Sequence, residues 1–281
     1  MNKQEIRDYK GINASLIKWG WLISPYYTGQ ERNHLMSLAS KIDTLHGKKY
    51  KDQVSTEIGS LILQSNCSYH FRAVTVFEGY RTTPNMKKFS HLFEAGLLEF
   101  YRFNYIACLG IWIPIVEGIT RSMIGITFSR NFEKDLMKQL QAKFSCEQPF
   151  LDMIIDVLLK FYKKVFYCNV NSLRDLSSQN FNRHFFSHSI SHQPLYCRDN
   201  GLKLLNVFDT LLAIDFIVDR GFKAIFDGKN ERIKLREKYY ENVLRNSLSD
   251  HELFKLSLLK DHPHFDETFY YQKRPFNDLK S

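Results

Sequence analysis

The feature of this chain that most restricts its fold is the spacing of its apolar residues, which recur at steps of three and four along most of its length. That spacing places apolar side chains on one face of an α-helix, whereas a half-buried strand would alternate apolar and polar residues. No convincing run of such alternation occurs, and only 13 Gly and 7 Pro are present among 281 residues to interrupt helices. The sequence therefore predicts an all-α fold built as a multi-helix bundle.

The periodic stretches predict a series of helices, several of them bounded by proline, which disfavours helix in the residue before it. The predicted helices cover residues 2–19, 30–46, 50–64, 68–81, 86–95, 98–124, 130–143, 149–167, 181–192, 200–227, 230–246 and 249–259. The segments 98–124 and 200–227 are expected to form the core. The second of these is apolar nearly all round, so we expect one long buried helix there.

The same pattern suggests three regions along the chain. Residues 1–85 carry shorter amphipathic helices and are expected to form an N-terminal helical subdomain. Residues 86–229 contain the two core helices, and residues 230–281 contain the last helices and an aromatic, polar tail. No low-complexity linker separates these regions, and no internal repeat is found.

Charge and cysteine content restrict the partners and the compartment. The formal net charge of +9 favours an acidic partner such as nucleic acid, although the positive charge is spread along the chain. The five Cys form no CxxC pair, which indicates reduced thiols. The polar N-terminal residues lack the apolar core of a signal peptide, and the longest apolar run, 106–119, is too short for a bilayer. We therefore expect a cytoplasmic protein with no membrane partner.

The densest polar cluster of the sequence lies between the core helices, at residues 180–192. It contains three His, one Arg, two Asn and three Ser. Asn180 or Asn182 can cap a helix that begins here, directing backbone N–H groups and the positive end of the helix dipole toward Arg183 and His184. Such a helix start favours an anion. His and Ser are also common at partly buried helix ends, where they hydrogen-bond the backbone.

The segment Phe181–His188, with the sequence FNRHFFSH, resembles the Arg-x4–6-His signature of the HEPN superfamily. The likeness is greatest to bacterial members related to abortive-infection and toxin proteins. In that signature a polar residue commonly follows the Arg, as His184 does here, whereas Ser189 stands where Gly is usual. The upstream segment 105–119 resembles the helix that carries an acidic residue in those proteins. The resemblance covers approximately residues 86–227.

The resemblance implies a HEPN-like helical core and, as in many members, a metal-independent endoribonuclease that acts as a homodimer. It implies Arg183 and His188 as the catalytic pair, Asn182 and His184 as supporting polar residues, and no cofactor. Imidazole titrates near neutral pH and guanidinium can neutralise phosphorane oxygens, which agrees with RNA cleavage by 2′-hydroxyl attack. We therefore expect a ribonuclease of a toxin or antiviral-defence system, with RNA as substrate and an antitoxin or other protein as a further partner.

The five-residue step between Arg183 and His188 affects how the two could meet. On a regular helix they would point about 140° apart, from 3.6 residues per turn, so convergence needs an irregular helix start or a second protomer. Spacing alone is weak support, because Arg245 and His251 show a similar spacing in what looks like an ordinary solvated helix junction.

Glu117 lies on a predicted core helix, from which it could orient the imidazole or the guanidinium of the site. A local ion pair with Arg121, four residues further on, is the slightly better explanation. The competing function is a non-catalytic helical HEPN-like module that binds RNA, a nucleotide or a protein partner.

A metal site is the second alternative, because His184, His188 and His192 would line one face of a helix, with Cys197 nearby. Zinc hydrolase helices usually add a Glu base and a distant third ligand, and no such pattern is present here. We therefore expect no metal.

Overall fold

The computed structural model describes residues 3–27, 29–44, 48–125, 139–140, 142, 149–167, 197–221 and 228–261. These residues form nine α-helices with short 3-10 and π segments and no strand, so the all-α prediction is confirmed for this part of the chain. In chain order the elements are α1 (Lys3–Leu16), η1 (Ile17–Trp19), α2 (Gly29–Thr44), α3 (Lys48–Asn66), α4 (Tyr69–Val74), η2 (Thr75–Tyr80), η3 (Met86–Phe89), α5 (Ser90–Tyr101), α6 (Tyr105–Ile124), α8 (Pro149–Phe161), η4 (Tyr162–Phe166), α10 (Arg198–Arg220) and α11 (Glu231–Asp261).

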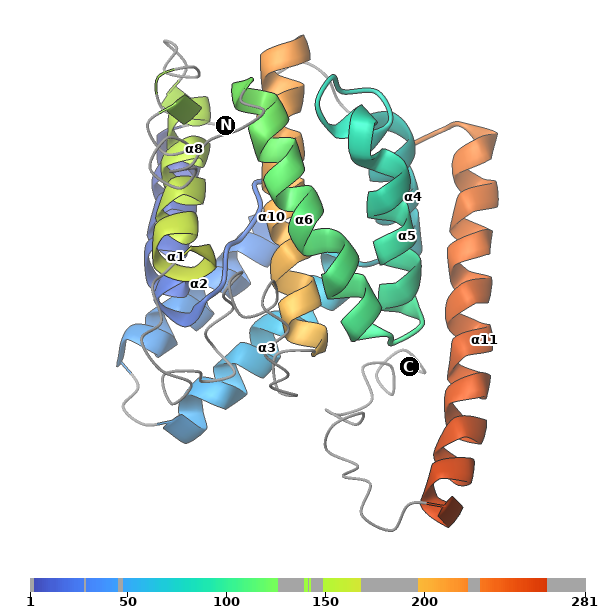
Figure 1. Ribbon diagram of the computed structural model, residues 1–281. Coiled ribbons are helices and arrows are strands. Elements are labelled where there is room, and N and C mark those ends of the chain that lie inside the picture. Colours follow the sequence, from blue (N-terminus) through green and yellow to red (C-terminus); the bar gives the residue numbers. More distant parts are fainter. Residues whose placement is uncertain are drawn as a thin grey trace.

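The bundle is arranged around α10, which lies in its middle (Figure 1). Helices α3, α6 and α8 pack against α10, and α1 and α2 pack on each other beside α8. Nearly every residue of α10 up to Ile217 is buried. The predicted long helix is thus confirmed as far as Arg220 and its burial as far as Ile217, and Gly221 with a φ of 72° ends it. Residues 222–227 lie outside the described residues.

The prediction of one continuous helix over 98–124 is wrong at its start. Helix α5 continues to Tyr101, Phe103 adopts a left-handed φ of 61°, and α6 begins at Tyr105. The side chain of Asn104 accepts a hydrogen bond from the Ala107 N–H at 3.3 Å and donates one to Glu99 at 2.8 Å. Asn104 therefore caps a new helix, which folds back to pack on α5.

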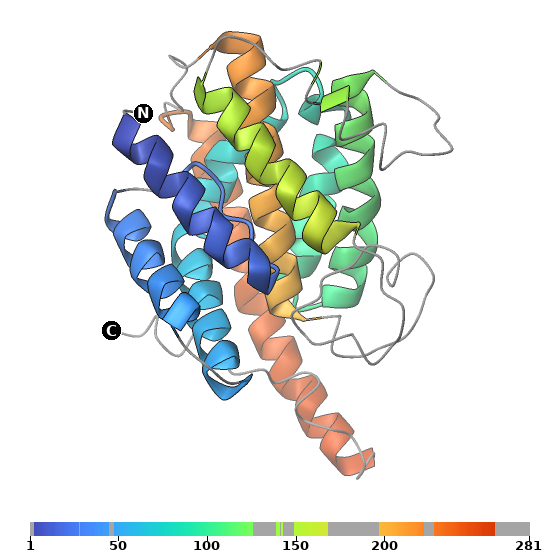
Figure 2. The ribbon, with the colours of Figure 1, turned by 90° about the vertical axis from the view of Figure 1, so that its left-hand side faces the viewer.

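The C-terminal helices also differ from prediction, because 230–246 and 249–259 belong to the single helix α11. No Gly or Pro lies between the two predicted segments to end a helix there. The inner face of α11 packs on α4 and α5, and Arg236 and Tyr240 both bind Glu94 of α5, at 2.6 and 2.7 Å. The far end of α11 extends beyond the other helices (Figure 2).

Helix α6 is longer than the apolar run at 106–119 that the sequence analysis treated as too short for a bilayer. By length and composition alone it is the one helix of the described residues that could cross a membrane. Half of its most apolar window is buried inside the bundle, a property it shares with core helices of soluble proteins.

Candidate functional site

Only the chain on either side of the predicted catalytic segment is described by the structure. Asn182, Arg183, His184 and His188 lie outside the described residues. The described chain ends before them at Tyr167, directly after η4, and resumes after them at Cys197, where α10 begins. Because α8 and α10 pack against each other, the segment that carries the predicted site joins two core helices.

Glu117 is the one predicted site residue that the structure describes. It lies on α6, and its Oε1 accepts hydrogen bonds from Arg121 Nε and Nη2 at 3.1 and 2.8 Å. The two side chains are largely buried, at 16% and 24% exposed. The local ion pair expected from the i,i+4 spacing is therefore present, and it orients the Glu117 carboxylate along its own helix.

The described chain contains a polar stripe that the sequence analysis missed. Helix α10 was described as apolar nearly all round, and this is wrong, because the stripe winds around it by about 60° at each step of three residues. Asn200, Lys203, Asn206 and Asp209 recur at steps of three residues, and all four are buried, with exposed fractions of at most 1%. Buried polar side chains need partners, so this stripe determines which segments can pack beside α10.

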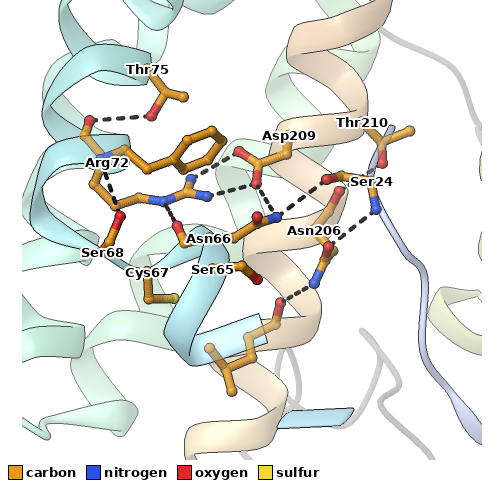
Figure 3. A network of polar contacts seen from close by, with 12 residues as sticks. Ser24, Ser65, Asn66, Cys67, Ser68, Arg72, Thr75, Asn206, Asp209 and Thr210 are labelled. Carbon is orange, nitrogen blue, oxygen red and sulfur yellow. Dashed lines mark hydrogen bonds and ion pairs between the residues drawn. The ribbon is translucent and has the colours of Figure 1, made fainter. Parts of the chain in front are cut away.

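At the C-terminal end of the stripe, Asp209 forms an ion pair with Arg72 of α4 (Figure 3). Arg72 donates from Nη1 to Oδ1 at 2.8 Å and from Nη2 to Oδ2 at 2.7 Å, and both side chains are fully buried. Arg72 Nε also donates to the carbonyl oxygen of Asn66, which ends α3. Burial lowers the pKa of Arg72, but the charge of Asp209 and the hydrogen bonds to it raise this pKa by a larger amount. The net shift is upward, so the guanidinium stays charged.

Other polar groups complete the coordination of Asp209. Asn66 Nδ2 donates to Oδ2 at 3.4 Å and to the hydroxyl of Ser24 at 3.3 Å, and the Tyr80 hydroxyl donates to Oδ1 at 3.1 Å. Burial, followed by the charge of Asp209, raises the pKa of Tyr80 well above its usual value. Tyr80 therefore remains a neutral donor to the carboxylate.

Asn206, one turn before Asp209, binds the loop that follows η1. Its Oδ1 accepts from the Ser24 N–H and from the Tyr27 hydroxyl, both at 3.1 Å. The same buried network thus joins this loop, the end of α3, α4 and η2 to one helix (Figure 3). This arrangement determines how the N-terminal helices sit on α10, and its buried groups bond to one another rather than face a ligand.

Asp215, near the other end of α10, holds the start of η3. Its Oδ2 accepts from the backbone N–H groups of Asn85 and Met86, at 2.9 and 3.0 Å, and its Oδ1 accepts from Asn85 Nδ2 at 2.7 Å. A carboxylate that accepts the first N–H groups of a helical turn stabilises that turn. Asp215 therefore anchors η3, which leads directly into α5.

The first turns of α10, just after the predicted site, contain a buried cation. Lys203 Nζ donates to Asn200 Oδ1 at 3.2 Å and lies 5.1 Å from the centre of the Trp21 ring. Burial lowers the pKa of Lys203, against the opposing influence of Cys197 and Asp199. Only 1% of Lys203 is exposed. Its contact with the Trp21 ring holds the start of α10 against the loop that contains Trp21.

Of the four residues of the metal alternative, the structure describes Cys197 alone. Cys197 is a half-buried free thiol at the start of α10, whereas His184, His188 and His192 lie outside the described residues. Within the described ranges, no three His, Cys, Asp or Glu side chains are grouped so that they could hold a metal ion.

Parts of the network carried a signal in the sequence. Asn200, Lys203, Asn206 and Asp209 recur at three-residue spacing among the apolar residues of this helix, and polar groups buried in this way need hydrogen-bond partners. Arg72 carried no such signal, because its segment reads as an ordinary amphipathic helix. Its partner lies far away in the chain and is brought close only by the fold.

No protein-family model, curated protein or solved structure matches this chain. The comparisons therefore add no support to the HEPN resemblance, which rests on the residues that carry it. Fold and comparisons together establish an all-helical protein in the part of the chain that the structure describes.

Proposed function

We propose that the protein is a metal-independent endoribonuclease of a toxin or antiviral-defence system, with a HEPN-like core. The observation that carries the proposal is the Asn182-Arg183-His184 start followed by His188, in a chain whose described residues form helices and no strand. Both predicted catalytic side chains belong to one short segment that leads into α10, the central helix.

In the proposed reaction, the 2′-hydroxyl oxygen of one ribose attacks the adjacent phosphorus, and the bond from phosphorus to the 5′-oxygen breaks. His188 accepts the proton of the 2′-hydroxyl, and the departing 5′-oxygen receives a proton from an imidazolium. Arg183 stabilises the negative charge of the phosphorane through two parallel N–H groups. The products are a 2′,3′-cyclic phosphate and a free 5′-hydroxyl.

Asn182 and His184 support this site as polar neighbours of the pair. The five-residue step from Arg183 to His188 favours a homodimer, because a second protomer can supply the group that one regular helix would point away. A dimer at micromolar concentration, measured by light scattering, is the expected state. We place the dimer in the cytoplasm, where RNA and an antitoxin or other protein partner are accessible.

Glu117 is a positioning residue in this proposal. Its carboxylate is engaged by Arg121 on the same helix, so the pair would act on the site together. Glu117→Gln is expected to change the pH profile of cleavage if it orients an imidazole, and to change only stability if the pair is purely local.

Cleavage of a defined RNA strand tests the function. The wild-type dimer is expected to cut in the presence of EDTA, to leave a cyclic phosphate and to spare a strand with 2′-deoxyribose at the scissile position. Cleavage of an all-DNA strand, or activity that depends on added zinc or magnesium, would overturn the proposal and favour the site of His184, His188 and His192.

The second candidate is a non-catalytic HEPN-like module that binds RNA, a nucleotide or a protein. Ser189 favours it, since this position in the resembled proteins is usually Gly and a Cβ restricts the backbone there. Binding of RNA without any cleavage product would support this candidate, and Ser189→Gly is the variant expected to restore cleavage.

A further inference from the structure

Helix α11 has an outer face that the bundle does not use. Its inner face, formed by Ile233, Tyr240 and Leu244, is buried against the bundle. On the opposite side, Leu235 and Tyr239 are 69% and 49% exposed, which places them among the few exposed large hydrophobic residues of the described chain. They stand one turn apart at i and i+4, so their side chains are neighbours on the helix surface.

Three cations surround this pair. Arg232, Lys234 and Lys238 are all exposed, and within the described residues no carboxylate forms an ion pair with any of them. Lys234 and Lys238 are themselves one turn apart, where like charges destabilise a helix. Arg232 and Lys234 also lie in its first turn, where the helix dipole disfavours positive charge. The arrangement therefore costs helix stability, and an anionic ligand on this face would offset that cost.

Carboxylates limit the extent of the basic face. Glu231 is exposed at its start, while Glu237 is engaged with His70 and Glu241 with Arg245. The cationic part is therefore confined to about two helical turns around the exposed apolar pair. A basic face of this size fits a short stretch of an anionic polymer better than a broad anionic surface.

The chemistry of this face favours single-stranded RNA over a lipid surface. A membrane-bound helix buries a wide apolar face in the lipid, but between Ile233 and Leu244 the apolar face of α11 is already packed on the bundle. An exposed tyrosine between lysines suits a nucleic acid strand, because a base can stack on the ring while the phosphates meet the ammonium groups.

We propose that the outer face of α11, formed by Arg232, Lys234, Leu235, Lys238 and Tyr239, binds a single RNA strand. In this arrangement Tyr239 stacks on a base and the three cations contact flanking phosphates. The inference rests on the proposed function in taking RNA as the partner, and it assigns to α11 a role in holding the strand.

Binding is measured by fluorescence anisotropy with a 2′-O-methyl RNA strand, which cannot be cleaved because its 2′-oxygen is blocked. Each phosphate contact with single-stranded nucleic acid contributes about 0.7 to the slope of log K against log salt. The variant Lys234→Gln/Lys238→Gln is therefore expected to reduce the slope by about 1.4. Tyr239→Ala is expected to weaken binding about 5- to 150-fold, and Tyr239→Phe to retain it.

The matched control is Lys10→Gln/Lys41→Gln, which removes the same charge from exposed positions on α1 and α2. Its salt slope is expected to remain that of the wild type. An equal loss of slope in the control, or unchanged binding in folded α11 variants, would overturn the proposal. Binding to anionic phospholipid vesicles without binding to RNA would overturn it as well.

The same variants separate this proposal from the nuclease. If the 2′-O-methyl strand binds through α11 but unmodified RNA is not cleaved, the proposed catalysis fails and the binding surface stands. If RNA is cleaved but the α11 variants bind as the wild type does, the surface fails and the nuclease stands.

Discussion

Arg72 and Asp209 are 137 residues apart in the sequence, yet two hydrogen bonds join the guanidinium of one to both carboxylate oxygens of the other. Both side chains are completely buried, so neither charge has water as a substitute partner. In a low-dielectric interior, the loss of one charge leaves the other uncompensated. The pair therefore fixes the position of α4 against α10.

Asp209→Asn is expected to lower the free energy of unfolding by about 3–5 kcal/mol, the cost of leaving a buried charge without its partner. Urea unfolding followed by circular dichroism measures it. Arg72→Met should cost a similar amount, and the double variant should cost less than the sum. The control is Asp156→Asn, which breaks an exposed ion pair with Lys160 and should cost less than about 1 kcal/mol. Additive losses in the double variant would contradict the coupling.

The sequence predicted helices well where one face is apolar and the other polar. The expected helix at 30–46 corresponds to Gly29–Thr44, because its buried residues recur at helical spacing. The prediction of one helix over 98–124 was wrong at 102–104, where Phe103 with a left-handed φ and the capping residue Asn104 interrupt the helix. A capping side chain determines such a helix boundary, and the spacing of the apolar residues does not predict it.

The buried network could be predicted only in part for a different reason. The three-residue row on α10 marks Asp209 as a buried group that needs a partner. Nothing in the sequence pairs it with Arg72, because the pairing depends on how the fold brings Arg72 of α4 to α10. The catalytic pair Arg183 and His188 is predicted from the motif alone and remains a prediction.

Alkaline pH should destabilise the fold partly through Cys67. Burial raises the pKa of this thiol from about 9 to about 12. Between these values the unfolded chain loses the proton and the folded chain keeps it, so stability is complete below pH 9 and falls as pH rises. The slope contributed by this one group is about 1.4 kcal/mol per pH unit.

The free energy of unfolding of wild type and Cys67→Ala, measured in urea from about pH 8 to 11 under reducing conditions, tests this. Buried tyrosines affect both proteins equally, so the difference between the two curves reports the thiol. The variant is expected to lose stability less steeply above about pH 9. Parallel curves would show that the Cys67 proton does not contribute.

Gly96 and Gly110 should respond oppositely to an added methyl group. A Cβ at Gly96 in α5 would lie 2.2 Å from Nε1 of buried Trp112, which donates to the Phe93 carbonyl oxygen at 3.0 Å. A Cβ at Gly110 in α6 meets nothing within 4 Å. Gly96→Ala should therefore cost about 1–3 kcal/mol by overpacking, and Gly110→Ala should gain about 0.5–1 kcal/mol from helix propensity. Thermal unfolding measures both, and equal shifts would contradict the packing.

Arg183 with His188, and Arg245 with His251, have a similar spacing but should respond differently to substitution by alanine. Arg183→Ala and His188→Ala should each remove most of the RNA cleavage in EDTA, and for His188 the loss of general acid–base help corresponds to about 10²–10⁴-fold. Arg245→Ala should leave the rate essentially unchanged, because Arg245 is 72% exposed and pairs with Glu241 one turn away. His251→Ala, which changes the other member of this pair, should also leave the rate essentially unchanged. Single-turnover cleavage of one labelled RNA by all four variants makes the measurement, with circular dichroism to establish that each is folded. Equal losses in the two pairs would show that an Arg and a His at this spacing do not mark the catalytic site.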